Sequence, residues 1–201
     1  ILGTWQSTLT NFRYLSGEWK KNCEEERLLG VSLTGILDNK ILGDTIEQTK
    51  TLLERLKDVS TDANLQLSTT LNIPVSTAIT CIKPSGTVSQ LVDSASGIHP
   101  RHSKYYVRRV RGDKKDPLTT FMVQQGIPSE DCVMRPESTT VFSFPKKAPH
   151  NALLRENLTA MEHLDLWMMY QQHWCEHKPS VTISVNEEEW PEVGAWVWKN
   201  F

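Results

Sequence analysis

The stretch that decides the fold is Lys83-Pro84-Ser85-Gly86-Thr87-Val88-Ser89. It follows the short β-branched run Ala78–Ile82, which predicts a strand, whereas Pro84 disfavours a continued strand and Gly86 permits a tight turn. A helix beginning near Thr87 would place free backbone N–H groups and the positive end of its dipole beside three hydroxyl side chains. The stretch therefore predicts a strand, a turn and a helix start that together could hold a phosphate.

This loop is not a Walker loop, because the G-x-x-x-x-G-K-[ST] spacing is absent and Lys83 precedes the glycine. Taken alone, the same residues fit a capped helix without any ligand equally well. The surrounding sequence has to decide between the two interpretations. The candidate phosphate-binding residues are Pro84, Ser85, Gly86, Thr87, Val88 and Ser89, with Lys83 as a weaker candidate.

Helical and extended patterns alternate along the chain, which is typical of an α/β fold. The predicted helices are Thr4–Leu29 with a break near Ser16-Gly17, Thr45–Leu65, Asp116–Gln125, Asn151–His177 and Glu187–Lys199. The predicted strands are Val31–Ile36, Ala78–Ile82, Tyr105–Val110, Thr139–Phe144, which we expect Pro145 to end, and Val181–Val185. An irregular segment is expected over Asp93–Lys104, which is rich in Ser, Gly, His and Pro.

Composition narrows the class of protein. With 201 residues, of which 38% are hydrophobic, the chain can bury one sizeable core, and we expect a single domain over residues 1–201. A net charge of -2 gives no general attraction to nucleic acid or to an anionic membrane. The four cysteines are widely spaced, and the apolar stretches are too short to span a bilayer. We therefore expect a cytoplasmic protein without a membrane partner.

Four ordered motifs carry a resemblance to a known family. They are Gly30–Ile36, the Lys83–Ser89 loop leading into Ser96–Pro100, Tyr106–Val110, and Trp174–His177 with Ser180–Val185. In these motifs the chain resembles the ribonucleotide reductases, most closely the adenosylcobalamin-dependent (class II) branch. The resemblance implies part of a ten-stranded α/β barrel, with the Lys83–Ser89 loop binding the phosphates of a ribonucleoside di- or triphosphate. It also implies an adenosylcobalamin cofactor and a thiol reductant for the full enzyme.

The family's cysteine motifs do not occur in this sequence. The resemblance implies an Asn-x-Cys-x-Glu loop with the radical cysteine, yet Cys23, Cys81 and Cys132 lie in other contexts, and a C-terminal cysteine pair is also missing. We therefore assign no catalytic residue. Together with Ile1 as the first residue, this leads us to expect a fragment of the reductase catalytic barrel that reduces no ribonucleotide to 2′-deoxyribonucleotide by itself.

The sequence also contains histidines that could form sites other than the phosphate loop. His173 and His177 are four apart on one predicted helix face and could share a metal ion, but Cys175 points away from them, so no metal site is predicted. The histidines equally suit a helix C-terminus. His99 could lie near substrate, and both His99 and His102 could be ordinary loop histidines.

A basic cluster supports the alternative function. Arg108, Arg109 and Arg111, next to Tyr105 and Tyr106, could bind phosphates and stack on bases. Such a short run is more often a solvated face or a set of local salt bridges, so a nucleic-acid partner is disfavoured. The alternative to a reductase is a noncatalytic nucleotide- or nucleic-acid-binding module.

Overall fold

The computed structural model describes residues 1–38 and 46–200. The chain forms two compact units, one of Ile1–Arg101 with Asn151–Phe201 and one of His102–His150. The expectation of one domain over residues 1–201 stays a prediction.

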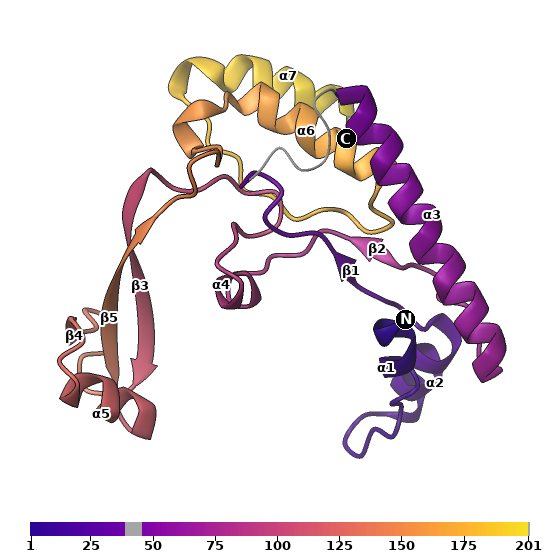
Figure 1. Ribbon diagram of the computed structural model, residues 1–201, viewed down its shortest axis with the longest axis horizontal. Coiled ribbons are helices and arrows are strands. Elements are labelled where there is room, and N and C mark those ends of the chain that lie inside the picture. The colour runs from indigo at the N-terminus through magenta and orange to yellow at the C-terminus, as the bar shows by residue number, and fades with distance from the viewer. Residues whose placement is uncertain (39–45, 201) are drawn as a thin grey trace. The chain divides into compact units, whose positions relative to one another are not determined.

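The first unit contains a two-stranded parallel sheet. Strand β1 (Val31–Ser32) pairs with β2 (Thr80–Cys81), so that Val31 lies opposite Thr80. Helices α3 (Ile46–Leu71) and α6 (Ala160–His173) pack against each other beside these strands (Figure 1). They enclose a core of buried side chains that comprises Leu53, Ile82, Ile98, Tyr170, Trp174 and Cys175.

Local signals start the helices of this unit. Thr159 caps α6, because its hydroxyl accepts a hydrogen bond from the Glu162 N–H while the Glu162 carboxylate accepts one from the Thr159 N–H. Ser16 likewise caps α2 (Gly17–Glu26). The remaining helices of the unit are α1 (Leu2–Gln6), the single turn α4 (Val88–Leu91), α7 (Trp190–Asn200), and 3₁₀ turns at Arg155–Asn157 and Glu187–Glu189.

The second unit is an antiparallel sheet with one helix. Its strand order is β3 (Tyr105–Asp113), β5 (Thr139–Lys147) and β4 (Ser129–Asp131). Helix α5 (Pro117–Gln124) begins at Asp116, whose carboxylate accepts a hydrogen bond from the Leu118 N–H at 2.9 Å. A Cβ on Gly112 would lie 2.4 Å from Thr119 Oγ1, so glycine permits the close approach of α5 to the sheet.

The predicted elements differ from the structure mainly in length. The predicted strand Val31–Ile36 shrinks to two residues, and Val181–Val185 forms no strand. The predicted helix Asn151–His177 begins only at Ala160, since the Thr159 capping box fixes its start. The predicted helix Thr4–Leu29 is two short helices, and Thr45–Leu65 is extended to Leu71, although Thr45 lies outside the described residues.

The prediction that Pro145 ends its strand is wrong. Pro145 lies inside β5 opposite Val107 of β3. Strand β4 accompanies β5 only along its first part, up to the pairing of Ser129 with Phe142. At Pro145 the β4 side of β5 is therefore a sheet edge, where the missing N–H of a proline costs no ladder hydrogen bond.

The mixed α/β content agrees with the predicted fold class. The described residues contain one two-stranded and one three-stranded sheet. Part of a ten-stranded barrel is therefore not confirmed. No helix among the described residues is both long and apolar enough to cross a membrane.

Candidate functional site

The Lys83–Ser89 loop leaves the sheet at the carboxyl end of β2, the end at which parallel α/β sheets place their ligands. It leads into α4, which is a single turn instead of the longer helix expected from the sequence. The Lys83 N–H donates to Ser32 Oγ of β1 at 3.0 Å, which fixes the start of the loop. The side chains of Lys83, Thr87 and Val88 are exposed.

Ser85 is the most tightly held residue of this loop. Its N–H donates to Ser96 Oγ at 2.9 Å, and its hydroxyl lies 2.8 Å from Thr34 Oγ1 and 3.3 Å from Ser96 Oγ. Thr34 Oγ1 also donates to the Ala95 carbonyl at 3.0 Å and accepts from the Gly97 N–H at 3.0 Å. One hydroxyl of the 30–36 segment therefore joins the loop to the 95–97 segment.

The direction of these hydrogen bonds follows from counting hydrogens. Thr34 has a single hydroxyl hydrogen, which it donates to the Ala95 carbonyl. Thr34 must therefore accept in its contact with Ser85, so the Ser85 hydroxyl is the donor there. The Ser96 hydroxyl remains free to donate toward Ser85 Oγ.

Ser89 also holds the loop. Its side chain is fully buried, and its hydroxyl and N–H both donate to the Ser85 carbonyl. By contrast, no hydrogen bond within the described residues joins the backbone N–H of Thr87 or of Val88 to an acceptor. The loop thus combines hydroxyls that are engaged internally with two backbone donors that are available to an anion.

A buried ion pair lies behind this network. Arg101 forms a bidentate pair with Asp38, with Nε to Oδ1 and Nη2 to Oδ2 both at 2.8 Å. Asp38 Oδ2 also accepts from the Ala95 N–H at 2.7 Å, and Arg101 Nη2 donates to the Asp93 carbonyl at 2.6 Å. The Asp38 and Arg101 side chains are 8% and 4% exposed, so a buried pair fixes both ends of the 93–95 segment.

His99 and His163 are both held by hydrogen bonds to backbone groups. His99 Nδ1 donates to the Ser96 carbonyl at 2.8 Å, and His99 Nε2 accepts from the Thr182 N–H at 3.0 Å, which requires the neutral ring. His163 is buried, and its Nε2 donates to the Ile98 carbonyl at 3.0 Å. Burial lowers the pKa of His163, although the bond to Ile98 partly opposes this shift.

The Trp174–Glu176 segment lies against β2. The Trp174 indole donates to the Cys81 carbonyl at 2.8 Å, and the Thr80 hydroxyl donates to the Trp174 carbonyl at 2.5 Å. Glu176 Oε2 accepts from the N–H of Ile79 at 2.7 Å. This segment therefore continues the hydrogen bonding of β2 along the side that β1 leaves open.

The four cysteines are free thiols. Burial raises the pKa of Cys81, and it raises the pKa of Cys175 to about 12. Hydrogen bonds from the N–H groups of Met134 and Arg135 lower the pKa of Cys132 in the second unit. Cys81 and Cys175 are therefore packing residues at neutral pH.

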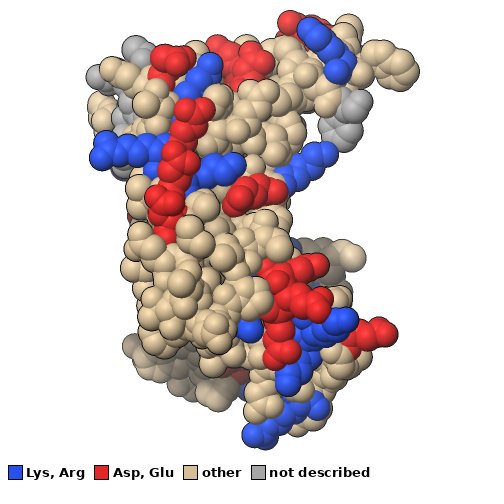
Figure 2. All heavy atoms as spheres, turned by 90° about the vertical axis from the view of Figure 1, so that its right-hand side faces the viewer, with Lys and Arg blue, Asp and Glu red and all other residues tan. Residues whose placement is uncertain are grey.

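The rival sites are engaged in local pairs. His173 Nδ1 lies 2.8 Å from Glu54 Oε1, and the described residues contain no cluster of three or more His, Cys, Asp or Glu arranged to hold a metal. In the basic cluster Arg109 pairs with Glu130, and nearby Lys114 pairs with Asp131 at 2.6 Å. Figure 2 faces the side on which α1, α2 and α3 are drawn in Figure 1, and there blue and red side chains occur side by side. The nucleic-acid alternative is not favoured.

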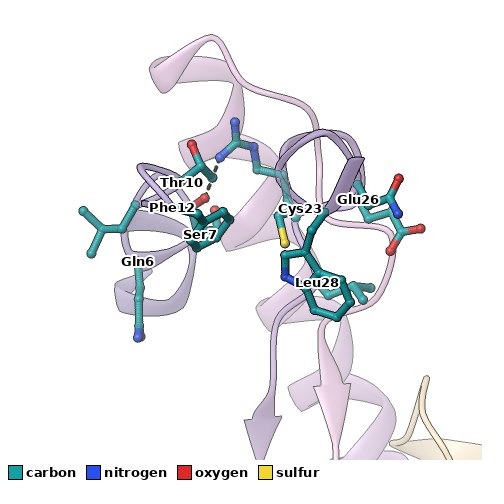
Figure 3. Close-up of a pocket in the computed structure, with 11 residues that line it drawn as sticks. Gln6, Ser7, Thr10, Phe12, Cys23, Glu26 and Leu28 are labelled. Atoms are coloured by element: carbon teal, nitrogen blue, oxygen red, sulfur yellow. Dashed lines mark hydrogen bonds between the residues drawn. The ribbon is translucent and has the colours of Figure 1, made fainter. Parts of the chain in front are cut away.

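A separate cavity of about 330 Å³ lies between the 6–12 segment and α2 (Figure 3). Cys23, Phe12 and Leu28 are among its lining residues, and the Arg27 guanidinium donates to the Ser7 carbonyl at 2.5 Å. Its lining is mostly apolar, and it contains none of the residues predicted to bind phosphate.

Asp38 and Arg101 were not predicted from the sequence, and Thr34 and Ser96 had no predicted role. Thr34 and Ser96 do lie in two of the four motifs that carry the family resemblance, so a signal for them existed. Asp38 and Arg101 are 63 residues apart, and only the folded chain brings them together.

Comparison with known proteins gives consistent relatives, although no family model matches the chain. An adenosylcobalamin-dependent ribonucleoside-triphosphate reductase from Euglena gracilis is 31% identical over 173 residues, which cover 85% of this chain and 24% of that protein. A reductase of the same name from Lactobacillus gasseri is 25% identical, covering 87% of this chain and 27% of its own length. The chain thus spans about a quarter of the length of these relatives.

A solved structure agrees on the fold. A B12-dependent (class II) ribonucleotide reductase superimposes with a TM-score of 0.75 at 23% identity, over 89% of this chain and 29% of that one. The resemblance inferred from the four motifs is therefore confirmed: over some 85% of its residues, the chain is homologous to a segment of the adenosylcobalamin-dependent ribonucleotide reductases.

Proposed function

We propose that this chain is the part of an adenosylcobalamin-dependent ribonucleotide reductase that anchors the substrate through its phosphates. The complete enzyme would convert a ribonucleotide to a 2′-deoxyribonucleotide by radical chemistry. The relatives are named as ribonucleoside-triphosphate reductases, which favours a triphosphate over a diphosphate. In this proposal the chain contributes binding and orientation, and none of its residues has a catalytic role.

One observation carries the proposal. The Thr87 and Val88 N–H groups have no acceptor within the described residues, and they follow β2 in the segment shared with the reductases. Backbone N–H groups without an internal acceptor can donate to anionic oxygens, and such charge-assisted hydrogen bonds are the stronger kind. The Thr87 hydroxyl is exposed beside them and could add a third donor.

The other predicted residues have supporting parts in this proposal. Pro84 and Gly86 shape the turn, and Ser85 and Ser89 hold it through the bonds described above. The Lys83 ammonium adds positive charge near the loop and lowers the pKa of neighbouring Cys81, against the larger effect of burial. Lys83 remains a weaker candidate for phosphate binding than the other residues of the loop.

The cobalamin cofactor is proposed only for the complete enzyme, where it would supply the radical chemistry. Four cavities lined by described residues have volumes of about 330 to 680 Å³. Cavities of this size suit drug-sized ligands, and a corrin ring with its nucleotide tail is larger. The described residues therefore do not fit the cofactor by themselves, and no step is assigned to it. A thiol reductant is likewise proposed for the complete enzyme alone.

The finer points of architecture and location are also proposals. The parallel pair β1–β2 would belong to the ten-stranded barrel of the family, and both compact units would belong to one catalytic domain. A cytoplasmic location would suit the free thiols of all four cysteines.

The test is a titration of the ¹⁵N-labelled chain with CTP, ATP and inorganic tripolyphosphate. We expect the Thr87 and Val88 amide resonances to shift most, with all three probes, because the site recognises phosphate. Thr87→Val should weaken binding by about fivefold through loss of one hydroxyl bond, whereas Thr61→Val on α3 should not change it. Shifts confined to other residues, or none at all, would contradict the proposal.

Turnover gives a second test. We expect the 201 residues to form no deoxyribonucleotide with adenosylcobalamin and a dithiol, because no cysteine lies in an Asn-x-Cys-x-Glu motif. Cofactor-dependent formation of deoxyribonucleotide by this chain would show that another of its cysteines carries the radical.

A further inference from the structure

We propose that Thr34 and the buried Asp38–Arg101 pair are positioning residues for the phosphate loop, and that Ser85 ties the loop in place and does not bind the phosphate through its hydroxyl. The inference rests on the proposed function, because it assigns roles within the same site. It divides the candidate residues into those that touch the ligand and those that hold the others still.

Thr34 is the junction of the network. Its hydroxyl makes three hydrogen bonds at 2.8 to 3.0 Å, to the Ser85 hydroxyl, the Ala95 carbonyl and the Gly97 N–H. These partners are 51 to 63 residues away in sequence, so the contacts are purely tertiary. Loss of this one hydroxyl would free the Ser85 hydroxyl and leave two backbone groups of the 95–97 segment without their partner.

The Asp38–Arg101 pair fixes the 93–95 segment, which continues into the residues that hydrogen-bond to Thr34 and Ser85. Asp38 holds the Ala95 N–H, and Arg101 holds the Asp93 carbonyl, on either side of Ser94. The Ser94 N–H in turn donates to the Ser89 carbonyl at 2.9 Å at the far end of the loop. The ion pair is thus connected to both ends of the Ser85–Ser89 turn through one short segment.

The same network removes Ser85 and Ser89 from direct phosphate binding. The Ser85 hydroxyl hydrogen is donated to Thr34, and the Ser89 hydroxyl hydrogen is donated to the Ser85 carbonyl. An oxygen that has given its hydrogen away can offer only lone pairs, which repel an anionic phosphate. The donors left for the ligand are the Thr87 and Val88 N–H groups and the Thr87 hydroxyl.

The Lys83–Val88 loop depends on these hydrogen bonds because it has few stabilising contacts within itself. Most of Lys83–Val88 is exposed, and α4 is one turn long, so neither packing nor a helix fixes the two amides. Binding to a loop that must first be ordered is weakened by the cost of ordering, and a preformed loop avoids that cost. The network therefore acts on affinity by holding the amides in one arrangement before the ligand arrives.

The experiment compares Thr34→Val, which removes the hydroxyl at nearly constant shape, with Thr34→Ser, which keeps it. Thr61→Val is the matched control, since the Thr61 hydroxyl bonds only within its own helix. Two quantities are measured on the ¹⁵N-labelled chain, the hydrogen-exchange rates of the Ser85 and Ser89 amides without ligand and the dissociation constant of inorganic tripolyphosphate. Chemical denaturation of each variant verifies that the fold persists.

We expect Thr34→Val to speed exchange of both amides and to weaken tripolyphosphate binding about tenfold, with both effects restored by Thr34→Ser. Asp38→Asn should also speed exchange and weaken binding. If Asp38→Asn unfolds the chain, the comparison of Thr34→Val with Thr34→Ser still tests the inference. Unchanged exchange and affinity in Thr34→Val would overturn the inference.

The outcomes also separate the inference from the proposed function. If the wild-type chain binds no tripolyphosphate, the phosphate site is wrong, while the exchange rates still test whether Thr34 holds the loop. If Ser85→Ala lowers affinity more than Thr34→Val does, Ser85 binds the phosphate directly and its assignment as a tie is wrong.

Discussion

Glu176 and Thr80 are joined in both directions. The Glu176 N–H donates to the Thr80 carbonyl at 2.9 Å, and Glu176 Oε2 accepts from the Thr80 N–H at 3.0 Å. A side chain and a backbone group thus extend the ladder of β2, whose other edge pairs with β1. The strand that leads into the Lys83–Ser89 loop is thereby fixed on both sides, although it is only two residues long.

Glu176→Gln tests this pairing. Burial disfavours the Glu176 carboxylate, but hydrogen bonds from Thr80 and Ile79 outweigh it and hold the pKa below the ordinary 4.5. Glutamine loses the charge and keeps an acceptor, so we expect about 1 kcal/mol less stability at pH 7, limited by the exposure of the side chain to solvent. Urea unfolding at pH 7 measures it.

The same substitution has a defined pH dependence. A carboxyl whose folded pKa is lowered contributes stability above its ordinary pKa and loses it as pH falls through the folded value. The wild type and Glu176→Gln should therefore differ at pH 7 and converge below about pH 4. A constant difference between them from pH 7 to pH 3 would show that the charge has no part in the effect.

His163 gives a second pH dependence, in a higher window. Burial lowers its pKa below 6.5, so the unfolded chain takes up a proton before the folded one does. The contribution of His163 to stability is complete above about pH 6.5 and declines as pH falls below it. Denaturation curves at pH 8, 6.5 and 5 should show this loss in the wild type, and His163→Gln should lose less over the same range.

The thiols should differ in reactivity. At pH 7.5 iodoacetamide should label Cys132 before Cys81 and Cys175, since hydrogen bonds from the Met134 and Arg135 N–H groups lower its pKa and its side chain, although only 6% exposed, lines a cavity. Cys81 and Cys175 should stay unlabelled until the chain is unfolded, because burial raises the pKa of both. Peptide mass spectrometry at successive times gives the order in which the cysteines are labelled. Rapid labelling of Cys175 in the folded chain would mean that the core around it opens.

Gly112→Ala should destabilise the second unit. The added Cβ would lie 2.4 Å from Thr119 Oγ1, and Thr119 is buried, so Thr119 must leave its rotamer or the sheet and α5 must separate, at a cost of about 1 to 3 kcal/mol. Gly194→Ala is the control, because nothing lies within 4 Å of its Cβ position on α7, and alanine should favour that helix. Thermal unfolding followed by resonances of the His102–His150 unit measures the effect of Gly112→Ala, and resonances of α7 measure that of Gly194→Ala. Equal midpoints for wild type and Gly112→Ala would show that α5 has room to move.

The sequence determined the local features of this protein. The strand–loop–helix order around Lys83–Ser89 could be read from β-branching, Pro84 and Gly86, and the Asp116-Pro117 start of α5 from capping chemistry. The four motifs were sufficient to identify the reductase relatives. These features depend on neighbouring residues, which is why a linear pattern reports them.

Only the tertiary structure decided which residues hold the candidate site. Thr34, Ser96 and the Asp38–Arg101 pair reach the loop across tens of residues, and no local periodicity encodes such contacts. Strand lengths likewise depended on partners, since β5 continues through Pro145 only because β4 has already ended. Hydrogen-bond donors and acceptors are allocated among all groups that the fold brings within reach, so the hydrogen bonds of Ser85 and Ser89, and the roles proposed from them, follow from the folded chain and not from their place in the motif.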